Sequence, residues 1–306
     1  MQPITSVNTL PTKPQLSGFV ALLKPVTWFP PMWAFLCGAV SSGASITEQP
    51  LLILSGIVLT GPLVCGASQV INDWCDREVD AINEPDRPIP SGRVPPTTAL
   101  WFAIIWSALA LLWGGMLGLV VAAATAAGLI LAWAYSAPPL RLKRNGWWGN
   151  AAVGISYEGL AWATRAAVFL GGALPNAHIL TLALLYSIGA HGIMTLNDFK
   201  SITGDRAMGL KSLPAALGAD TAARLACVVM ALPQILVIAL LIHWSHDIGW
   251  HPWVLALLLA LQGLAMRRLL KDPETYAPWY NGTGVTAYVT GMMVAAAAIA
   301  SVGVSP

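Results

Sequence analysis

Four carboxylates stand close together in residues 72–80, Asn-Asp-Trp-Cys-Asp-Arg-Glu-Val-Asp, in a chain of which only 10% of the residues are charged. On a continuing helix, Asn72, Asp76 and Asp80 recur every four residues with Asp73 beside them, which predicts one acidic stripe. Like charges this close repel, so such a stripe requires a neutralising cation. Because Mg²⁺ prefers oxygen ligands and often shares them with phosphate, the segment predicts a metal–diphosphate site.

A second polar segment, residues 197–206, repeats the Asn-Asp-aromatic opening and later places Arg206 directly after Asp205. If Asp198 and Asp205 face the first segment, the two together would hold Mg²⁺ ions that neutralise charge on a departing diphosphate. Cations are then expected on the remaining phosphate oxygens; the candidates are Lys24, Arg77, Lys200 and Arg206. The alternative interpretation is a pair of ordinary solvated loops.

The elements that position these segments are predicted to be membrane helices. Hydrophobic residues make up 56% of the chain and the mean hydropathy is +0.66, outside the range of soluble domains. Since a span needs about 20 apolar residues, the sequence predicts an all-α membrane protein with about nine transmembrane helices. These are residues 29–46, 50–71, 98–116, 117–136, 149–170, 177–196, 222–244, 252–270 and 283–303.

The positive charges give the predicted orientation. Of the 16 Lys and Arg residues, 15 lie on one side of the nine-helix arrangement, and only Arg165, inside the fifth predicted span, breaks the pattern. The positive-inside rule therefore places the N-terminus and both acidic segments in the cytoplasm. The net charge of +2 gives no sign of nucleic-acid binding. Residues 1–17 are predicted to be a flexible tail without a cleavable signal, overlapping a short interfacial helix from Gln15 to Leu23.

One loop follows the first acidic segment, and a second loop follows the fourth predicted span. Residues 83–93 contain three prolines, which exclude a helix, so this loop is either a lid over the site or a rigid connection. Residues 137–144 are basic and serve either topology or ligand contact. The four cysteines show no metal-ligand spacing and are interpreted as reduced thiols.

The two acidic segments resemble the aspartate-rich motifs of the UbiA superfamily of intramembrane prenyltransferases. The longer strings at residues 71–92 and 197–214 are similar to those of its chlorophyll and bacteriochlorophyll synthase branch. The opening Lys-Pro-Val-Thr-Trp-Phe-Pro-Pro-Met-Trp-Ala, residues 24–34, is closer to the bacteriochlorophyll side. The similarity extends from about residue 18 over nearly the whole chain. One departure is Ser201, where many relatives carry an aspartate.

The resemblance implies one prenyltransferase domain over residues 1–306, a central cavity, and an active site capped on the cytoplasmic side. The implied reaction joins the propionate of a bacteriochlorophyllide to geranylgeranyl or phytyl diphosphate and releases diphosphate. It implies two Mg²⁺ ions on a site in the bacterial inner or intracytoplasmic membrane, with pigment-delivery or photosynthetic assembly proteins as further partners. The implied metal–diphosphate residues, four of them also catalytic, are Asn72, Asp76, Asp80, Asp198 and Asp205.

Three ionisable residues inside predicted spans are further candidates. Glu158 is costly at membrane depth and is expected either to steer the pigment or to pair with Arg165, seven residues on. His191 is expected either to ligate the magnesium of a chlorin or to hydrogen-bond a neighbouring helix.

Other functions remain open at this point. A chlorophyllide, a quinone precursor or haem are alternative acceptors within the superfamily. A transporter would place its site near the bilayer midplane, whereas both acidic segments lie at one surface. A pigment-binding assembly factor would not need two Mg²⁺-type motifs.

Overall fold

The computed structural model describes residues 16–43, 48–169, 173–245 and 249–301, and every regular element within these ranges is a helix. The predicted tail therefore lies outside the described residues, except for its last two, which open α1 (Leu16–Leu23). This helix confirms the short segment expected there. The all-α prediction is also confirmed.

The first acidic segment ends one long helical column. α3 (Pro50–Val58) continues through a π-helical turn, η2 (Leu59–Cys65), into α4 (Gly66–Asn83). The wide turn accommodates Pro62, which cannot donate a backbone hydrogen bond. Trp106 Nε1 donates to the Pro62 carbonyl at 2.8 Å, so the break is supported from outside. The helix therefore does continue through residues 72–80, as the acidic stripe required.

The remaining elements of the first half surround this column. They are η1 (Pro25–Thr27), α2 (Phe29–Ser41), α5 (Pro96–Met116), α6 (Leu119–Ser136) and η3 (Leu142–Arg144). Asn145 begins the next column, since its side chain accepts from the backbone N–H groups of Trp147 and Trp148.

The second half repeats the interrupted pattern. α7 (Gly146–Gly154) passes through a second π-helical turn, η4 (Ile155–Leu160), into α8 (Ala161–Phe169). The second acidic segment follows α9 (Ala177–Asn197) and forms η5 (Asp198–Ser201) and α10 (Ile202–Ala207). The chain then forms α11 (Leu213–Leu217), α12 (Ala219–Trp244), α13 (His251–Leu269) and α14 (Pro273–Ser301).

The predicted count of nine spans is not confirmed. Among the described residues, seven helices are long and apolar enough to cross a membrane, or up to eight if the bent pair from Leu16 to Ser41 is one span. The predicted span 149–170 is not among them, because Asn150, Glu158 and Arg165 make this column more polar.

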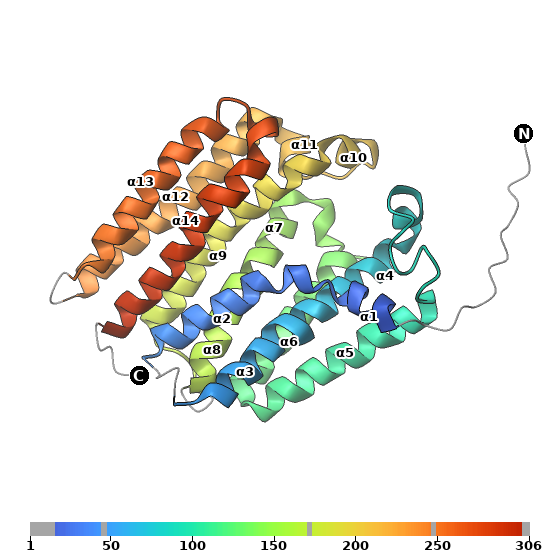
Figure 1. The fold of residues 1–306 in the computed structure, drawn as a ribbon, viewed down its shortest axis with the longest axis horizontal. Helices are drawn as coiled ribbons and strands as arrows, with labels where there is room; N and C mark the ends of the chain where they lie inside the picture. Colours follow the sequence, from blue (N-terminus) through green and yellow to red (C-terminus); the bar gives the residue numbers. More distant parts are fainter. Residues whose placement is uncertain (1–15, 44–47, 170–172, 246–248, 302–306) are drawn as a thin grey trace, which may run out of the picture.

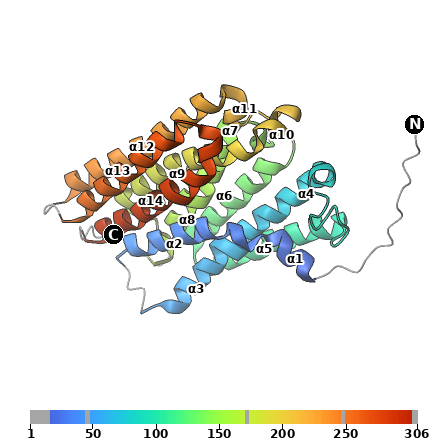
Figure 2. The same ribbon diagram turned by 45° about the horizontal axis from the view of Figure 1, so that its top comes forward.

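The long helices lie side by side, with α12 and α13 on one side and α5 on the other (Figures 1 and 2). The largest buried cluster joins α2, α8, α9, α12 and α14 around Trp162, Tyr186 and Tyr288. Two smaller clusters lie around α4 and α5. These contacts hold the ends of α4 and α9 at one end of the bundle, where Asn83 Nδ2 meets Met208 Sδ at 3.7 Å.

Close packing of α2 against α8 gives a stability prediction. A Cβ on Gly38 would lie 2.2 Å from the Trp162 carbonyl oxygen, which is backbone and cannot move aside cheaply. Gly38→Ala is expected to lower the free energy of unfolding by about 1–3 kcal/mol. Thermal unfolding in detergent measures it, with Gly282→Ala as the control, since among described atoms none lies within 4 Å of a Cβ there. An equal effect at both positions would contradict the packing argument.

Candidate active site

The acidic stripe on α4 divides into two pairs. At about 100° per residue, Asp76 is rotated by about 40° from Asn72, whereas Asp80 and Asp73 are rotated by about 80° and 100°. Asn72 and Asp76 therefore face α6, where Asn72 Nδ2 donates to Ser136 Oγ at 3.3 Å. Asp73 and Asp80 face the loop that follows α4. One stripe in sequence thus serves two surfaces in the fold.

Asp76 is held by two cations from the loop between α6 and α7. Arg141 Nη2 lies 3.0 Å from Asp76 Oδ1, and Lys143 Nζ pairs with Oδ2. Burial lowers the pKa of Lys143, although the ion pair acts in the opposite direction. Because desolvation outweighs the single carboxylate, further negative charge beside Lys143 would be stabilising. The basic loop therefore folds back onto α4, where Asp76 holds it.

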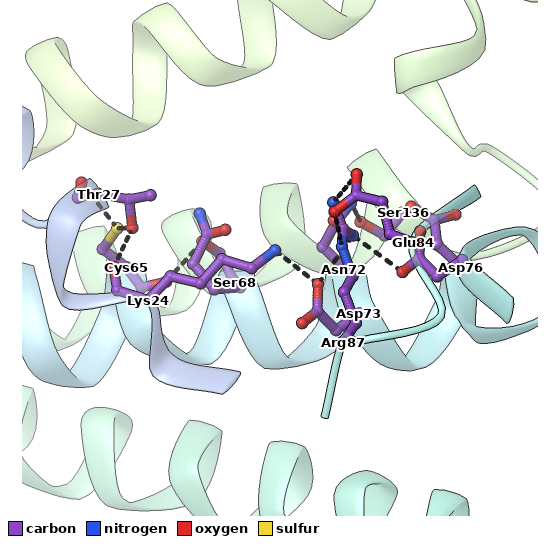
Figure 3. Close-up of polar contacts among 12 residues, drawn as sticks. Lys24, Thr27, Cys65, Ser68, Asn72, Asp73, Asp76, Glu84, Arg87 and Ser136 are labelled. Carbon is purple, nitrogen blue, oxygen red and sulfur yellow. Dashed lines mark hydrogen bonds and ion pairs between the residues drawn. The ribbon is translucent and has the colours of Figure 1, made fainter. Parts of the chain in front are cut away.

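Asp73 and Asp80 share Arg87 from the loop of residues 83–93. Arg87 Nη1 lies 3.3 Å from Asp73 Oδ1 and 2.9 Å from Asp80 Oδ2, and Lys24 Nζ lies 2.6 Å from Asp73 Oδ1 (Figure 3). Two charge-assisted hydrogen bonds from Arg87 also lower the pKa of Glu84. The loop is thus folded back over the end of α4 rather than leading away from it.

Asp198 and Asp205, the acidic residues of the second segment, accept hydrogen bonds from neutral donors. Asn150 Nδ2 donates to Asp198 Oδ2 at 3.4 Å. Asp205 Oδ2 accepts from Ser201 Oγ at 3.0 Å and from Ser212 Oγ at 2.5 Å. Ser201, where many relatives carry an aspartate, therefore orients Asp205 here. Among the described residues the donors to Asp198 and Asp205 are thus neutral, in contrast to the two cations that hold Asp76.

Asp76 of the first acidic segment lies at the same end of the bundle as Asp198 and Asp205 of the second. Tyr135 lies within electrostatic reach of Asp76, Asp198 and Asp205, so all three surround the end of α6. Backbone hydrogen bonds join the segment before α7 to the segment before α11. Gly146 N–H donates to the Lys211 carbonyl at 2.8 Å, and Lys211 N–H donates to the Arg144 carbonyl at 3.0 Å. The predicted juxtaposition of the two acidic segments is present in the structure.

A cavity of about 290 Å³ leads from this end into the membrane-spanning part. Asn72 and Tyr135 line it near the acidic pairs, and Leu59, Gly128 and Leu160 line it further along. Its volume is at the lower end of the about 300–1,000 Å³ found for small-molecule sites. Both π-helical turns contribute residues to its lining. A slender apolar chain suits this shape.

Some predicted residues lie away from the cavity. Arg77 stacks on Trp74 and pairs with the exposed Glu78 at 3.1 Å. Arg206 is exposed and donates to the Ala215 carbonyl at 3.4 Å. Lys200 is exposed but lies within electrostatic reach of Asp198 and Glu84, between the two segments. Of the four predicted phosphate cations, Lys24 and Lys200 are therefore the two beside the acidic residues.

Of the two alternatives for Glu158, pairing with Arg165 is not observed. Within the described residues the two form no ion pair, and Glu158 Oε2 and all three Arg165 side-chain nitrogens are buried without partners. Arg165 instead lies over the rings of Phe35 and Phe169. A separation of seven residues on a helix is about 10 Å, too far for direct contact.

His191 takes the role of a helix–helix contact. Its Nε2 lies 3.2 Å from the Trp147 carbonyl oxygen, and its ring packs on that of Trp147. Nδ1 is buried without a partner. The structure therefore favours the hydrogen-bonding alternative for His191 over contact with the cavity, whose lining does not include it.

The donor set fits Mg²⁺ only together with substrate. Within the described residues, no three His, Cys, Asp or Glu side chains gather closely enough to hold a metal ion by themselves. The five predicted ligands therefore do not form a preassembled cage. Mg²⁺ usually keeps waters and takes one or two carboxylates plus substrate phosphates. The oxygen-only donors, and the buried, unpartnered Oδ2 of Asp73, meet that requirement.

Facing acidic pairs, cations beside them and an apolar cavity define a membrane-embedded site for a lipid-like diphosphate. The UbiA prenyltransferase family model matches residues 27–283, and the chain belongs to this family. The bacteriochlorophyll synthase 33 kDa chain of Cereibacter sphaeroides is 56% identical over 293 residues, 96% of each chain. The chloroplastic chlorophyll synthase of Avena sativa is 40% identical, over 90% of this chain and 75% of that one.

The fold is also similar to that of a solved UbiA homologue from Archaeoglobus fulgidus bound to GPP and Mg²⁺. The TM-score is 0.66 at 19% sequence identity, over 90% of this chain and 99% of the homologue. At this identity the likeness concerns the fold. It confirms the predicted UbiA-type helical architecture.

Proposed function

We propose that this protein esterifies the propionate of bacteriochlorophyllide a with geranylgeranyl or phytyl diphosphate and releases diphosphate. The observation that carries the proposal is a mainly apolar cavity whose end is lined by Asn72 and Tyr135, with Asp76, Asp198 and Asp205 within electrostatic reach of Tyr135. This arrangement suits an isoprenoid chain with its diphosphate at the acidic end. The acceptor is supported by the identity of 56% to a bacteriochlorophyll synthase chain against 40% to a chlorophyll synthase.

In this proposal, Asn72, Asp76, Asp80, Asp198 and Asp205 hold two Mg²⁺ ions and, through them, the diphosphate. The ions would supply neutralisation of the charge that develops on the leaving group. Lys24, Lys143, Arg141 and Lys200 contribute further positive charge beside the diphosphate. Arg77, Arg206, Glu158 and His191 keep only indirect roles. The acceptor carboxylate attacks C1 of the isoprenoid. Because a propionate is already ionised at neutral pH, no general base is required.

The proposed setting is a bacterial inner or intracytoplasmic membrane, with the whole of residues 1–306 acting as one domain. The positive-inside rule places the N-terminus and the diphosphate site in the cytoplasm. Soluble isoprenoid diphosphate then enters from the cytoplasmic side, while the pigment arrives through the bilayer or from an assembly protein.

The test uses purified protein in detergent with bacteriochlorophyllide a, geranylgeranyl diphosphate and Mg²⁺, and follows the esterified pigment by chromatography. We expect product that disappears with a chelator and returns when Mg²⁺ is added back. Equal turnover of chlorophyllide would overturn the acceptor assignment. Folded protein that releases no diphosphate with any acceptor would overturn the enzyme assignment in favour of transport or pigment assembly.

A further inference from the structure

Four neutral polar side chains on the cavity wall are joined by hydrogen bonds into a cluster, which we call the Tyr157 cluster: Cys65, Ser68, Gln69 and Tyr157. Tyr157 comes from η4, whereas the other three belong to the end of η2 and the start of α4. The Tyr157 hydroxyl is the centre, with Gln69 Nε2 at 3.0 Å, Ser68 Oγ at 3.3 Å and Cys65 Sγ at 3.4 Å.

The cluster continues the polar face of α4 into the membrane. Figure 3 shows Cys65, Ser68, Asn72 and Asp76 following one another along this column. Gln69 precedes Asn72 by three residues and Asp76 by seven, which is about 4.5 Å and 10 Å along the helix. A group bound at the cluster therefore lies one to two helical turns below the predicted diphosphate, at the depth of the first atoms of the isoprenoid.

Counting hydrogens shows which donors are available to a ligand. The single hydroxyl hydrogen of Ser68 is taken by the Cys65 carbonyl at 2.7 Å, so in the Ser68–Tyr157 contact Tyr157 must donate. At 3.3 Å that bond is longer than the usual 2.5–3.0 Å between hydroxyl oxygens. Gln69 uses one amide N–H on Tyr157, and its second has no partner within the described part of the chain. The cavity wall thus offers one free donor, the second N–H of Gln69, and a second donor when the Tyr157 hydroxyl exchanges its long bond to Ser68 for a bond to the ligand.

A carboxylate is the ligand chemistry that matches two adjacent donors, since it accepts hydrogen bonds at two oxygens and donates none. Both donors are neutral, so they orient the anion without pairing it with a fixed positive charge, and it remains nucleophilic. The cavity volume of about 290 Å³ admits a carboxylate-bearing arm beside the first part of an isoprenoid chain. A tetrapyrrole ring would have to stay at the opening.

We propose that the Tyr157 hydroxyl and the free N–H of Gln69 bind the acceptor's carboxylate and aim one oxygen at C1 of the isoprenoid diphosphate. This inference rests on the function proposed above. One bond forms, between the carboxylate oxygen and C1, and one breaks, between C1 and the diphosphate oxygen. The diphosphate leaves with the electron pair of the broken bond, and Tyr157 and Gln69 keep their hydrogens.

The test measures equilibrium binding of bacteriochlorophyllide a, and of its propionate methyl ester, to the full-length protein by pigment fluorescence without donor. The wild type is expected to bind the acid about tenfold to a hundredfold more tightly than the ester, because hydrogen bonds to a charged group are strong. In Tyr157→Phe with Gln69→Leu this preference should fall to about twofold. Each single variant should lose part of it. Thr164→Val, which removes a hydroxyl elsewhere on the cavity wall, should retain it.

A second readout separates acceptor positioning from a structural role. In Tyr157→Phe, the KM for the acceptor should rise about tenfold while the KM for the isoprenoid diphosphate changes by less than about twofold. If the wild type forms ester but the double variant keeps the wild-type preference for the acid, the carboxylate site is wrong and the proposed function stands. If the wild type neither binds the pigment nor esterifies it, both are wrong.

Discussion

Replacing Asp76 with asparagine is expected to lower kcat for ester formation by about 10³-fold. Asp76 is the predicted ligand that pairs with two cations, Arg141 and Lys143, one helical turn from Asn72 on the cavity wall. Asparagine keeps the shape and one oxygen but removes the charge that would hold a divalent cation against the diphosphate. Loss of one group that stabilises developing charge costs about 10²–10³ in kcat, and loss of a metal contact adds to this. The measurement is diphosphate release and esterified pigment under saturating substrates.

The matched control is Glu78→Gln, which removes a carboxylate from the same helix. Glu78 is exposed, and Arg77 is its sole ion-pair partner among the described residues, so its loss should change kcat by less than about twofold. A folding check is required because Asp76→Asn leaves Lys143 and Arg141 without their anion, and thermal unfolding in detergent supplies it. Wild-type turnover by folded Asp76→Asn protein would remove Asp76 from the site.

The sequence was sufficient to predict the parts of the site whose positions follow from helical spacing. Residues 72–80 and 197–206 end long helices on the same side of the membrane by parity, and the structure brings Asp76 within reach of the same tyrosine as Asp198 and Asp205. What spacing could not supply was the division of the stripe. A repeat of four residues drifts by about 40° at each step, so Asp80 turns to Arg87 while Asp76 turns to Arg141.

The partners of the acidic residues were beyond sequence reasoning because they depend on how loops fold back. Arg141 and Lys143 lie 65 and 67 positions from Asp76 along the chain. From the sequence, the basic charge of their loop is explained equally well by membrane topology and by ligand contact. The proline-rich loop that contains Arg87 is likewise consistent with either a lid or a rigid connection. The only available signal was that both loops lie on the side of the acidic segments. Glu158 and Arg165 lie seven residues apart, and the sequence left their pairing open as an alternative. The helix rise over seven residues does not allow that pair.

Lys143→Met is expected to be the second most damaging substitution, lowering kcat by about 10²-fold with a smaller rise in the KM for isoprenoid diphosphate. Lys143 is half-buried beside the cavity end, and burial lowers its pKa, which shows that desolvation is not fully compensated by Asp76 alone. A diphosphate arriving there supplies the missing negative charge, and the interaction strengthens as the leaving group gains charge. That increase is why the effect should appear in kcat rather than in binding alone.

Arg144→Met is the control, because Arg144 lies in the same 3₁₀ turn but is exposed, and it should alter kcat by less than about twofold. Equal losses in the two variants would indicate that the loop acts through its overall charge. A loss specific to Lys143 would place that ammonium group beside the departing diphosphate.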